Sequence, residues 1–326
     1  MKLLLTHTPQ ARAQYYGARA LARLRGLVEV LLHEGDAPLD AAGAIALARE
    51  ADLIIADRAT ALPAAVFAGL PGLKAALRCA VDIRNIDVAA ASQAGVLVTH
   101  AEAGFVASVV ELTLGLMVDL SRGISSAVAD YRSGAPPEIR MGRQLAGSIA
   151  GIVGYGRIAR VLAPLLAQLG MTVLVADPYA PVDDARFTKL PLPEMLGRAD
   201  YVICLAVANK ETENLIDAAA FARMKPEAFF VNVSRGNLVD EAALAAALRE
   251  NRIAGAALDV GRAPDQMPSP ELARLPNVIA TPHIGGLTPP AIESQAFDTV
   301  RQVEALLKGE VPQGAVNLDR WTRRLR

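Results

Sequence analysis

The chain has 326 residues, of which 52% are hydrophobic and 21% are charged, and 33 basic side chains balance 34 acidic ones to give a net charge of −1. So hydrophobic a composition excludes a disordered chain. The balanced charge argues against a nucleic-acid partner, because nothing supplies a large field that neutralises phosphates. At roughly 150 residues per domain, the length predicts about two domains.

Two cysteines, Cys79 and Cys204, are too few for a disulfide framework and predict a reducing compartment. The apolar run near the N-terminus is shorter than the roughly 7–15 residues of a signal peptide. The apolar stretch 106–118 is interrupted by polar residues and is shorter than the roughly 20 residues that cross a bilayer. We therefore expect a cytoplasmic protein with no membrane partner.

Short apolar runs alternate with Ala- and Leu-rich helical segments along the chain. The expected strands are 3–5, 28–32, 53–56, 75–79 and 96–99, followed after a break by 149–153, 173–176, 201–205, 229–233, 254–260 and 278–280. Continuously apolar strands between helices are typical of a parallel sheet that is covered on both faces. The two series predict an α/β protein with two doubly wound parallel sheets.

The break between the two series predicts one long helix over 103–128 and a polar connector over 133–147. A further helix, over 290–308, follows the last strand, and its position suggests that the chain returns to the first unit. We expect the basic C-terminal end to be a solvated tail; it contains Trp321, Arg323, Arg324 and Arg326.

Residues 154–159 read GYGRIA, a G-x-G-x-x-A pattern between an expected strand and an expected helix over 157–169. In a dinucleotide-binding loop, Gly154 would allow the tight turn and Gly156 would let the backbone approach a pyrophosphate. The N–H groups at the helix start would hold the anion. The alternative is a tight strand-to-helix turn that binds no ligand.

Asp177 ends the next expected strand, 23 residues after Gly154, where an acidic side chain can accept hydrogen bonds from an adenosine ribose. Its charge would repel a 2′-phosphate, and residues 178–180 offer no Arg to bind one. We therefore predict NAD rather than NADP. The alternative is an Asp that only starts the turn before Pro178.

Arg235 and His283 each follow a strand of the second series, at the edge where α/β proteins bind ligands. A guanidinium suits a carboxylate, and an imidazole can pass a proton near neutral pH. Together they suit hydride transfer on a 2-keto acid, with a nicotinamide as hydride donor. The alternatives are a surface Arg that caps a turn and a structural His. No His, Cys or acidic cluster has metal-ligand spacing, so we predict no metal.

Five segments together resemble the D-isomer-specific 2-hydroxyacid dehydrogenase family: GYGRIA (154–159), DPY (177–179), VNVSRGNLVDEAAL (231–244), AALDV (256–260) and TPHIGG (281–286). The resemblance implies a Rossmann-like NAD-binding domain of residues 101–288. This domain would be inserted into a flavodoxin-like substrate domain made of residues 1–100 and 289–326. It also implies a homodimer formed through the cofactor domain.

The same resemblance implies the site residues. Arg235 and His283 match the family's catalytic pair. The substrate carboxylate would bind the backbone of Ala80, Val81 and Asp82, together with Arg235. The residues expected to contact NAD are Gly154, Tyr155, Gly156, Arg157, Ile158, Asp177, Val233, Ser234, Arg235, Asp259, His283 and Gly285.

Two segments depart from the family pattern. Pro264 stands where the family has a catalytic Glu, and either Asp265 takes that role or it is a solvated turn residue. In the substrate loop, Ala80 and Asp82 replace glycines and Arg84 replaces an Asp. A carboxylate beside an anion site is unfavourable unless it is turned away or paired, with Arg78 or Arg84 as the available partners.

The sequence thus predicts an NAD-dependent oxidoreductase that transfers a hydride between a 2-hydroxy acid and a 2-keto acid with D specificity. One alternative is an NAD(H)-binding sensor or scaffold whose catalysis is vestigial. Another is a formate-dehydrogenase-like enzyme, which would need a Gln beside the His; Gln266 is near but misaligned.

Overall fold

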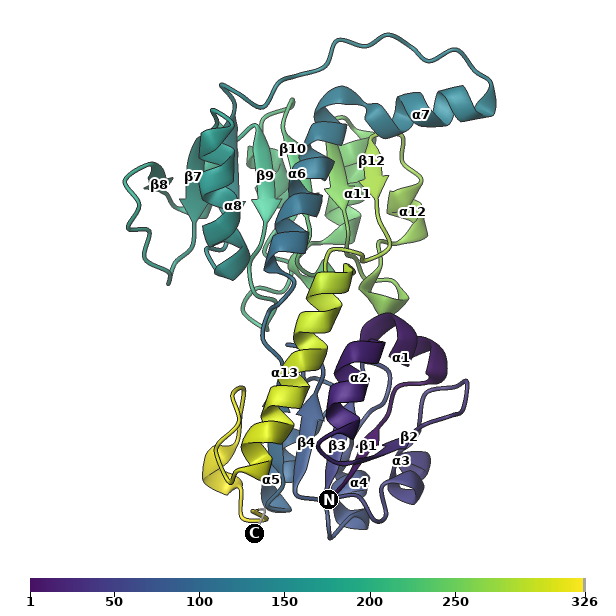
Figure 1. Cartoon of the computed structure of the whole chain (residues 1–326). Coiled ribbons are helices and arrows are strands. Elements are labelled where there is room, and N and C mark those ends of the chain that lie inside the picture. The colour runs from purple at the N-terminus through teal and green to yellow at the C-terminus, as the bar shows by residue number, and fades with distance from the viewer. Residues whose placement is uncertain (325–326) are drawn as a thin grey trace. The chain divides into compact units, whose positions relative to one another are not determined.

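The structure is a computed structural model that describes residues 1–324, except the side chain of Asp265. Its contacts divide the chain into two compact units (Figure 1). The N-terminal unit combines Met1–Phe105 with Thr288–Arg326, and the central unit is Val106–Leu287. The chain therefore leaves the first unit, builds the second and returns.

The N-terminal unit is built on a five-stranded parallel sheet in the order β2-β1-β3-β4-β5. Its strands are β1 (Lys2–Leu5), β2 (Glu29–Leu32), β3 (Leu53–Ala56), β4 (Ala75–Arg78) and β5 (Leu97–His100). The apolar residues of one face pack against α2 (Ala18–Arg25) and α13 (Pro289–Leu307). Those of the other face pack against α3 (Ala41–Leu47), α4 (Ala64–Gly69) and α5 (Val88–Gln93). The short α1 (Pro9–Tyr15) contacts α13.

The C-terminal end of the chain packs onto this unit. Trp321 is 6% exposed and belongs to the same apolar cluster as α13. Arg323 donates hydrogen bonds to the carbonyls of Leu70 and Leu73, at 3.0 and 3.1 Å. The prediction of a solvated tail is therefore wrong for these two residues, because carbonyls left at the end of α4 give the guanidinium a partner. Arg326 lies outside the described residues.

The central unit is built on a seven-stranded parallel sheet in the order β12-β11-β10-β9-β6-β7-β8. Its strands are β6 (Ile149–Val153), β7 (Thr172–Ala176), β8 (Phe187–Lys189), β9 (Tyr201–Cys204), β10 (Phe229–Asn232), β11 (Gly255–Leu258) and β12 (Val278–Ala280). The sequence did not predict the edge strand β8. The doubly wound parallel architecture predicted from the sequence is confirmed.

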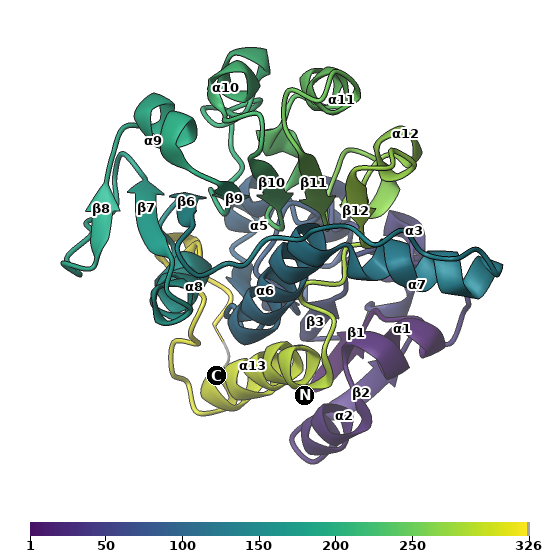
Figure 2. The ribbon, with the colours of Figure 1, turned by 90° about the horizontal axis from the view of Figure 1, so that it is seen from above.

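Helices cover both faces of this sheet (Figure 2). One face carries α9 (Leu192–Arg198), α10 (Ala218–Arg223), α11 (Glu241–Arg249) and α12 (Pro270–Ala273). The other carries α6 (Val106–Arg122) and α8 (Arg157–Gln168). Because both faces are buried, ligands can reach the central strands only at their ends.

The single helix expected over 103–128 is instead two helices, α6 and α7 (Ile124–Ser133), so that prediction is wrong. Gly123 separates them with a φ of +65°, a left-handed conformation that a glycine adopts without strain and that stops the α-helical hydrogen bonding. Among residues 1–324, no single helix has the length and hydrophobicity to cross a membrane. α6 and α7 have the necessary length and hydrophobicity only when taken together, and the two helices are bent by 67° relative to one another.

Candidate active site

The glycine loop lies between β6 and α8, at the carboxyl edge of the seven-stranded sheet. Gly154 has a φ of +88°, and a Cβ there would lie 2.6 Å from the Cα of Ala206, so only glycine fits. Gly156 caps α8 without a side chain, and a Cβ there would meet nothing within 4 Å. The first helical bond runs from Arg160 N to Gly156 O, which leaves the N–H groups of the first turn without a helical acceptor. This open helix start fits a dinucleotide pyrophosphate.

Asp177 follows β7 and accepts three backbone hydrogen bonds. They come from Tyr155 N at 2.7 Å and from Tyr179 N and Ala180 N at 2.8 Å. Partial burial opposes ionisation, but the donors at Ala180, Tyr155 and Tyr179 outweigh it and hold the pKa of this carboxyl below its usual value. Asp177 is therefore an anion that braces the glycine loop and leaves lone pairs for a ribose hydroxyl.

Arg235 follows β10 and is held through its backbone. The buried side chain of Asn232 donates from Nδ2 to Arg235 O at 3.0 Å and accepts from Ser234 N at 3.1 Å. Ser234 Oγ donates to Ala206 O at 2.7 Å, which ties this loop to the loop after β9. A Cβ at Gly236 would lie 2.2 Å from the backbone of Gly261, so the loops after β10 and β11 touch.

His283 follows β12 with a φ of +55°, a strained conformation for a residue with a side chain. Asp259, 1% exposed at the end of β11, holds this loop on both sides of the His. It accepts from Thr281 Oγ1 at 2.6 Å and from the N–H groups of Ile284 and Gly285 at 2.8 Å. Strain of about 1–3 kcal/mol maintained by a buried carboxylate is typical of a functional site.

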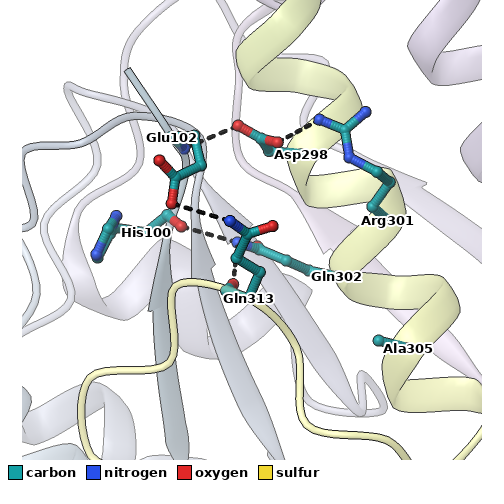
Figure 3. A pocket seen from close by; sticks show the side chains of 7 residues that line it. All are labelled: His100, Glu102, Asp298, Arg301, Gln302, Ala305 and Gln313. Atoms are coloured by element: carbon teal, nitrogen blue, oxygen red, sulfur yellow. Dashed lines mark hydrogen bonds and ion pairs between the residues drawn. The ribbon is translucent and has the colours of Figure 1, made fainter. Parts of the chain in front are cut away.

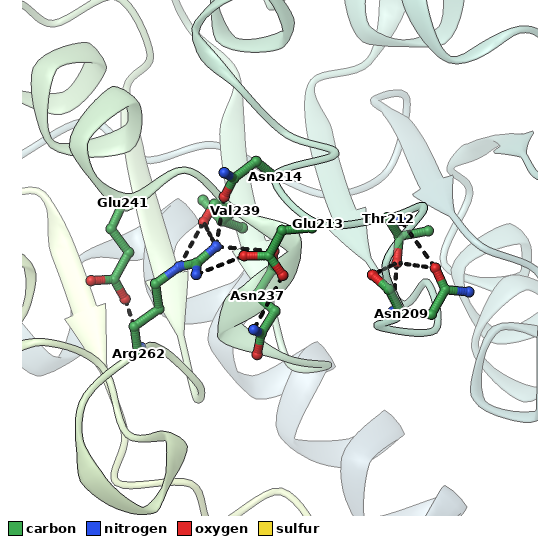
Figure 4. Close-up of polar contacts among 8 residues, drawn as sticks. All are labelled: Asn209, Thr212, Glu213, Asn214, Asn237, Val239, Glu241 and Arg262. Carbon is green, nitrogen blue, oxygen red and sulfur yellow. Dashed lines mark hydrogen bonds and ion pairs between the residues drawn. The ribbon is translucent and has the colours of Figure 1, made fainter.

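The loop after β11 carries Asp265 in a short 3₁₀ turn, η2 (Pro264–Gln266), and Arg262 anchors it (Figure 4). Arg262 pairs with Glu213 Oε1 at 2.8 Å and donates to Asn214 Oδ1 at 2.6 Å. It also donates to the carbonyls of Asn237 and Val239, and its own N–H donates to Glu241 Oε1 at 2.8 Å. The side chain of Asp265 lies outside what the structure describes.

The predicted substrate loop, residues 80–84, follows β4 at the carboxyl edge of the five-stranded sheet. The Asp82 carboxylate is paired: Arg84 Nη2 donates to it at 2.6 Å. The buried Arg78 donates from Nε to the carbonyl of Asp82 at 2.9 Å. Of the two ways to accommodate Asp82, the structure therefore shows pairing, and Arg84 is one partner of the carboxylate.

A separate cavity of about 150 Å³ lies in the N-terminal unit, between the end of β5 and α13 (Figure 3). Its polar groups bind one another: Gln302 Nε2 donates to the carbonyls of His100 and Gln313, and Gln313 Nε2 donates to Glu102. Arg301 pairs with Asp298, which accepts from Glu102 N. These bonds join the returning chain to the sheet.

The central unit thus brings the predicted cofactor residues and the predicted catalytic pair to one sheet edge. β10 and β12 flank β11, so Arg235 and His283 follow strands that lie about 10 Å apart. Sequence analysis missed Asn232 and Arg262 as residues that hold the loops. The signal for Asn232 was present, because it is the one amide in an otherwise apolar strand. Among residues 1–324, setting aside the Asp265 side chain, there is no cluster of three or more His, Cys, Asp and Glu side chains that could hold a metal ion.

Comparison with known proteins defines the class. The model of the NAD-binding domain of D-isomer-specific 2-hydroxyacid dehydrogenases matches residues 114–285, within the central unit. The chain is 36% identical to D-3-phosphoglycerate dehydrogenase of Mycobacterium leprae over 305 residues, which are 92% of this chain and 57% of that protein. It is 31% identical to the glyoxylate reductase of Thermofilum pendens, over 94% of this chain and 95% of that protein.

A solved structure, the TT0316 protein of Thermus thermophilus, superposes with a TM-score of 0.87 at 31% identity, over 97% of this chain and all of that one. The chain therefore belongs to the D-isomer-specific 2-hydroxyacid dehydrogenase family and carries its NAD-binding domain. It spans little more than half the length of the D-3-phosphoglycerate dehydrogenases that it matches.

Proposed function

We propose that this protein catalyses NAD-dependent interconversion of a 2-keto acid and a D-2-hydroxy acid. The observation that carries the proposal is the shared sheet edge: the glycine loop, Asp177, Arg235 and His283 all follow strands of one parallel sheet. Bound NADH supplies the hydride. In the direction of reduction, the carbonyl carbon gains that hydride and the carbonyl oxygen gains a proton, so a 2-keto acid, NADH and H⁺ give a 2-hydroxy acid and NAD⁺.

The chain's own residues would position the substrate and supply the proton. The Arg235 guanidinium would hold the substrate carboxylate and polarise the carbonyl. His283 would donate the proton to the carbonyl oxygen as a general acid. Asp259 and Asn232 would act through these two, since their hydrogen bonds hold the backbone on which the pair stands.

The unit Val106–Leu287 would be the cofactor domain, in place of the 101–288 expected from the resemblance, and the N-terminal unit would be the substrate domain. Within the N-terminal unit, the backbone N–H groups of residues 80–82 would bind the substrate carboxylate. Asp177 would favour NAD over NADP, because the donors around it keep it charged.

Asp265 remains the proposed partner of His283. What supports the proposal is that Arg262 and Glu241 anchor the backbone of its loop. An Asp265→Asn variant tests it: a lower kcat and a displaced acid limb of the pH profile support the role, and an unchanged kcat and profile exclude it.

The activity itself is tested with a panel of 2-keto acids and NADH, followed at 340 nm. Turnover of at least one of them, glyoxylate and 3-phosphohydroxypyruvate included, supports the proposal. Tight NADH binding without turnover of any 2-keto acid would favour the sensor or scaffold instead. Formate-dependent reduction of NAD would reveal the formate-dehydrogenase alternative.

A second copy of the chain is the proposed partner, bound through the central unit. α7 has no buried residue, and it exposes three large hydrophobic side chains: Ile124, Val128 and Tyr131. In the segment that follows, Ile139 and Met141 are 100% and 99% exposed. Light scattering tests this: a dimer that Ile139→Asp with Met141→Asp converts to monomer supports the proposal, and a monomeric wild type contradicts it.

The proposed location is the cytoplasm, without nucleic-acid or membrane partners. Its support is that Cys79 and Cys204 are unpaired and buried, and that burial raises the pKa of each thiol to about 12. Cell fractionation tests the location, and recovery in a secreted or membrane fraction contradicts it.

A further inference from the structure

The predicted substrate loop contains a bidentate ion pair between Asp82 and Arg84. Both residues depart from the family pattern. Arg84 Nε lies 3.0 Å from both oxygens of the Asp82 carboxylate, and Arg84 Nη2 lies 2.6 Å from Oδ2. Arg84 N also donates to Oδ1 at 3.0 Å, so the pair closes within three residues. The carboxylate in turn raises the pKa of Arg84, through the hydrogen bond first.

The backbone of this loop is arranged to offer N–H groups. Arg78, 4% exposed, donates to the carbonyls of Ala56 and Asp82 at 3.1 and 2.9 Å, and Ala80 O accepts from Ala101 N at 3.0 Å. The loop carbonyls of Ala80 and Asp82 are thus occupied by donors. The N–H groups of Ala80 and Val81 meet no acceptor among residues 1–324. A buried cation that bonds to a loop with unused N–H groups favours an anion there.

An uncompensated carboxylate at position 82 would oppose that anion. Two like charges a few ångströms apart near a protein surface repel strongly enough to weaken binding by tenfold or more. Asp82 nevertheless stands in the loop, and it pairs with an arginine two residues away, at a position where the resemblance places an Asp.

We propose that Arg84 sets the affinity of this loop for an anionic substrate: by pairing with Asp82 it offsets the charge that would otherwise repel the carboxylate of a 2-keto acid from the loop N–H groups. Its role is electrostatic compensation, and it does not contact the reacting atoms. This inference rests on the proposed function, because it concerns the affinity of the same substrate.

The experiment compares KM and kcat of the wild type with those of Arg84→Gln, Asp82→Asn and the double variant, using NADH and the best 2-keto acid. The dissociation constant of oxamate in the presence of NADH is measured in parallel. Arg84→Gln should raise KM and the oxamate dissociation constant about tenfold and leave kcat within about threefold. Adding Asp82→Asn should restore both constants to within about threefold of the wild type.

The central unit provides a matched control. Asp184 and Arg186 form the same local pair, with Arg186 Nη2 at 2.6 Å from Asp184 Oδ2 and Arg186 N at 3.0 Å from Oδ1. It lies outside the substrate loop, so Arg186→Gln should leave KM, kcat and oxamate binding unchanged. A Tm within a few degrees of the wild type shows that each variant is folded.

Two outcomes overturn the inference alone. In the first, the wild type is active and Arg84→Gln has the same KM and oxamate dissociation constant. In the second, both constants of the double variant are raised as much as those of Arg84→Gln. The second outcome would mean that Arg84 shapes the loop rather than balancing its charge. A wild type that neither turns over a 2-keto acid nor binds oxamate overturns the proposed function, and this inference with it.

Discussion

The loops at Asp177 and His283 in the central unit and the loop after β4 in the N-terminal unit are held through opposite halves of the peptide group. In the central unit, carboxylates accept from loop N–H groups: Asp177 takes three, and Asp259 takes two together with a hydroxyl. In the N-terminal unit, side-chain donors bind backbone carbonyls in the loops and at the strand end beside them. Arg78 binds two, and Asn85 Nδ2 binds those of Asp57 and Thr60 at 2.9 and 2.7 Å.

This difference determines which groups remain for a ligand. Where carboxylates occupy the N–H groups, as around His283, recognition of a ligand would depend on side chains and on the helix start after Gly156. Where guanidinium and amide donors bind the carbonyls, as around Ala80, the N–H groups remain available to bind an anion. The following variants test individual side chains of the two units.

The largest effect is expected from replacing the side chain of His283. His283→Gln should lower kcat by about 10²–10⁴-fold, because the proposed proton donor is lost. The dissociation constant of NADH, measured by fluorescence titration, should stay within about threefold. A variant with wild-type kcat would show that His283 is structural.

Asp259→Asn replaces the carboxylate that holds the loop of His283 with an amide. The amide cannot accept all of the hydrogen bonds that Asp259 accepts, and its NH₂ would face a backbone donor, so we expect a loss of about 3 kcal/mol in the free energy of unfolding. Thr281→Val removes only the hydroxyl bond and should cost about 1 kcal/mol. Urea denaturation measures both, and equal losses would contradict the graded role.

His7 lies at the end of β1, 2% exposed, with its ring edge on Tyr16 and its Nδ1 without a partner among the described residues. Burial lowers its pKa to about 4; Asp57 opposes this shift, and Arg78 and Arg12 add to it. Since the unfolded chain binds the proton more tightly, stability should fall as pH drops from about 6.5 towards 4.

Between pH 7 and 5, this single group should cost about 2 kcal/mol in the free energy of unfolding. His7→Phe keeps an aromatic ring against Tyr16 and should remove that part of the pH dependence. Urea titrations at the two pH values measure it. The same pH dependence in the variant would assign the loss to other groups.

The last prediction concerns cofactor choice. Asp177→Asn keeps a hydrogen-bond acceptor but removes the charge that is proposed to repel a 2′-phosphate. We expect the ratio of kcat/KM for NADH to that for NADPH to fall about tenfold, or about 1.4 kcal/mol. An unchanged ratio would place the discrimination elsewhere.

Features set by neighbours in sequence were predictable. The glycine loop, the end of β7 and the end of β12 were predicted because strand, turn and helix signals adjoin there. Asp82 and Arg84 were recognised as possible partners for the same reason, since they lie two residues apart.

Features set by distant partners were not predictable. Arg262 binds Glu213 and Asn214, which are almost fifty residues away in the chain, and Arg323 binds carbonyls some 250 residues away. The break at Gly123 escaped notice because the apolar pattern continues across it. No local pattern tells a glycine that stays helical from one that turns left-handed.

Hydride transfer is tested most directly by a single turnover with NADH that carries deuterium at the transferable position. The reductant is supplied with a 2-keto acid, and the product is examined by mass spectrometry and chiral chromatography. The account predicts one deuterium on C2 and only the D-2-hydroxy acid. An unlabelled product, the L enantiomer, or no product from a protein that binds NADH tightly would contradict it.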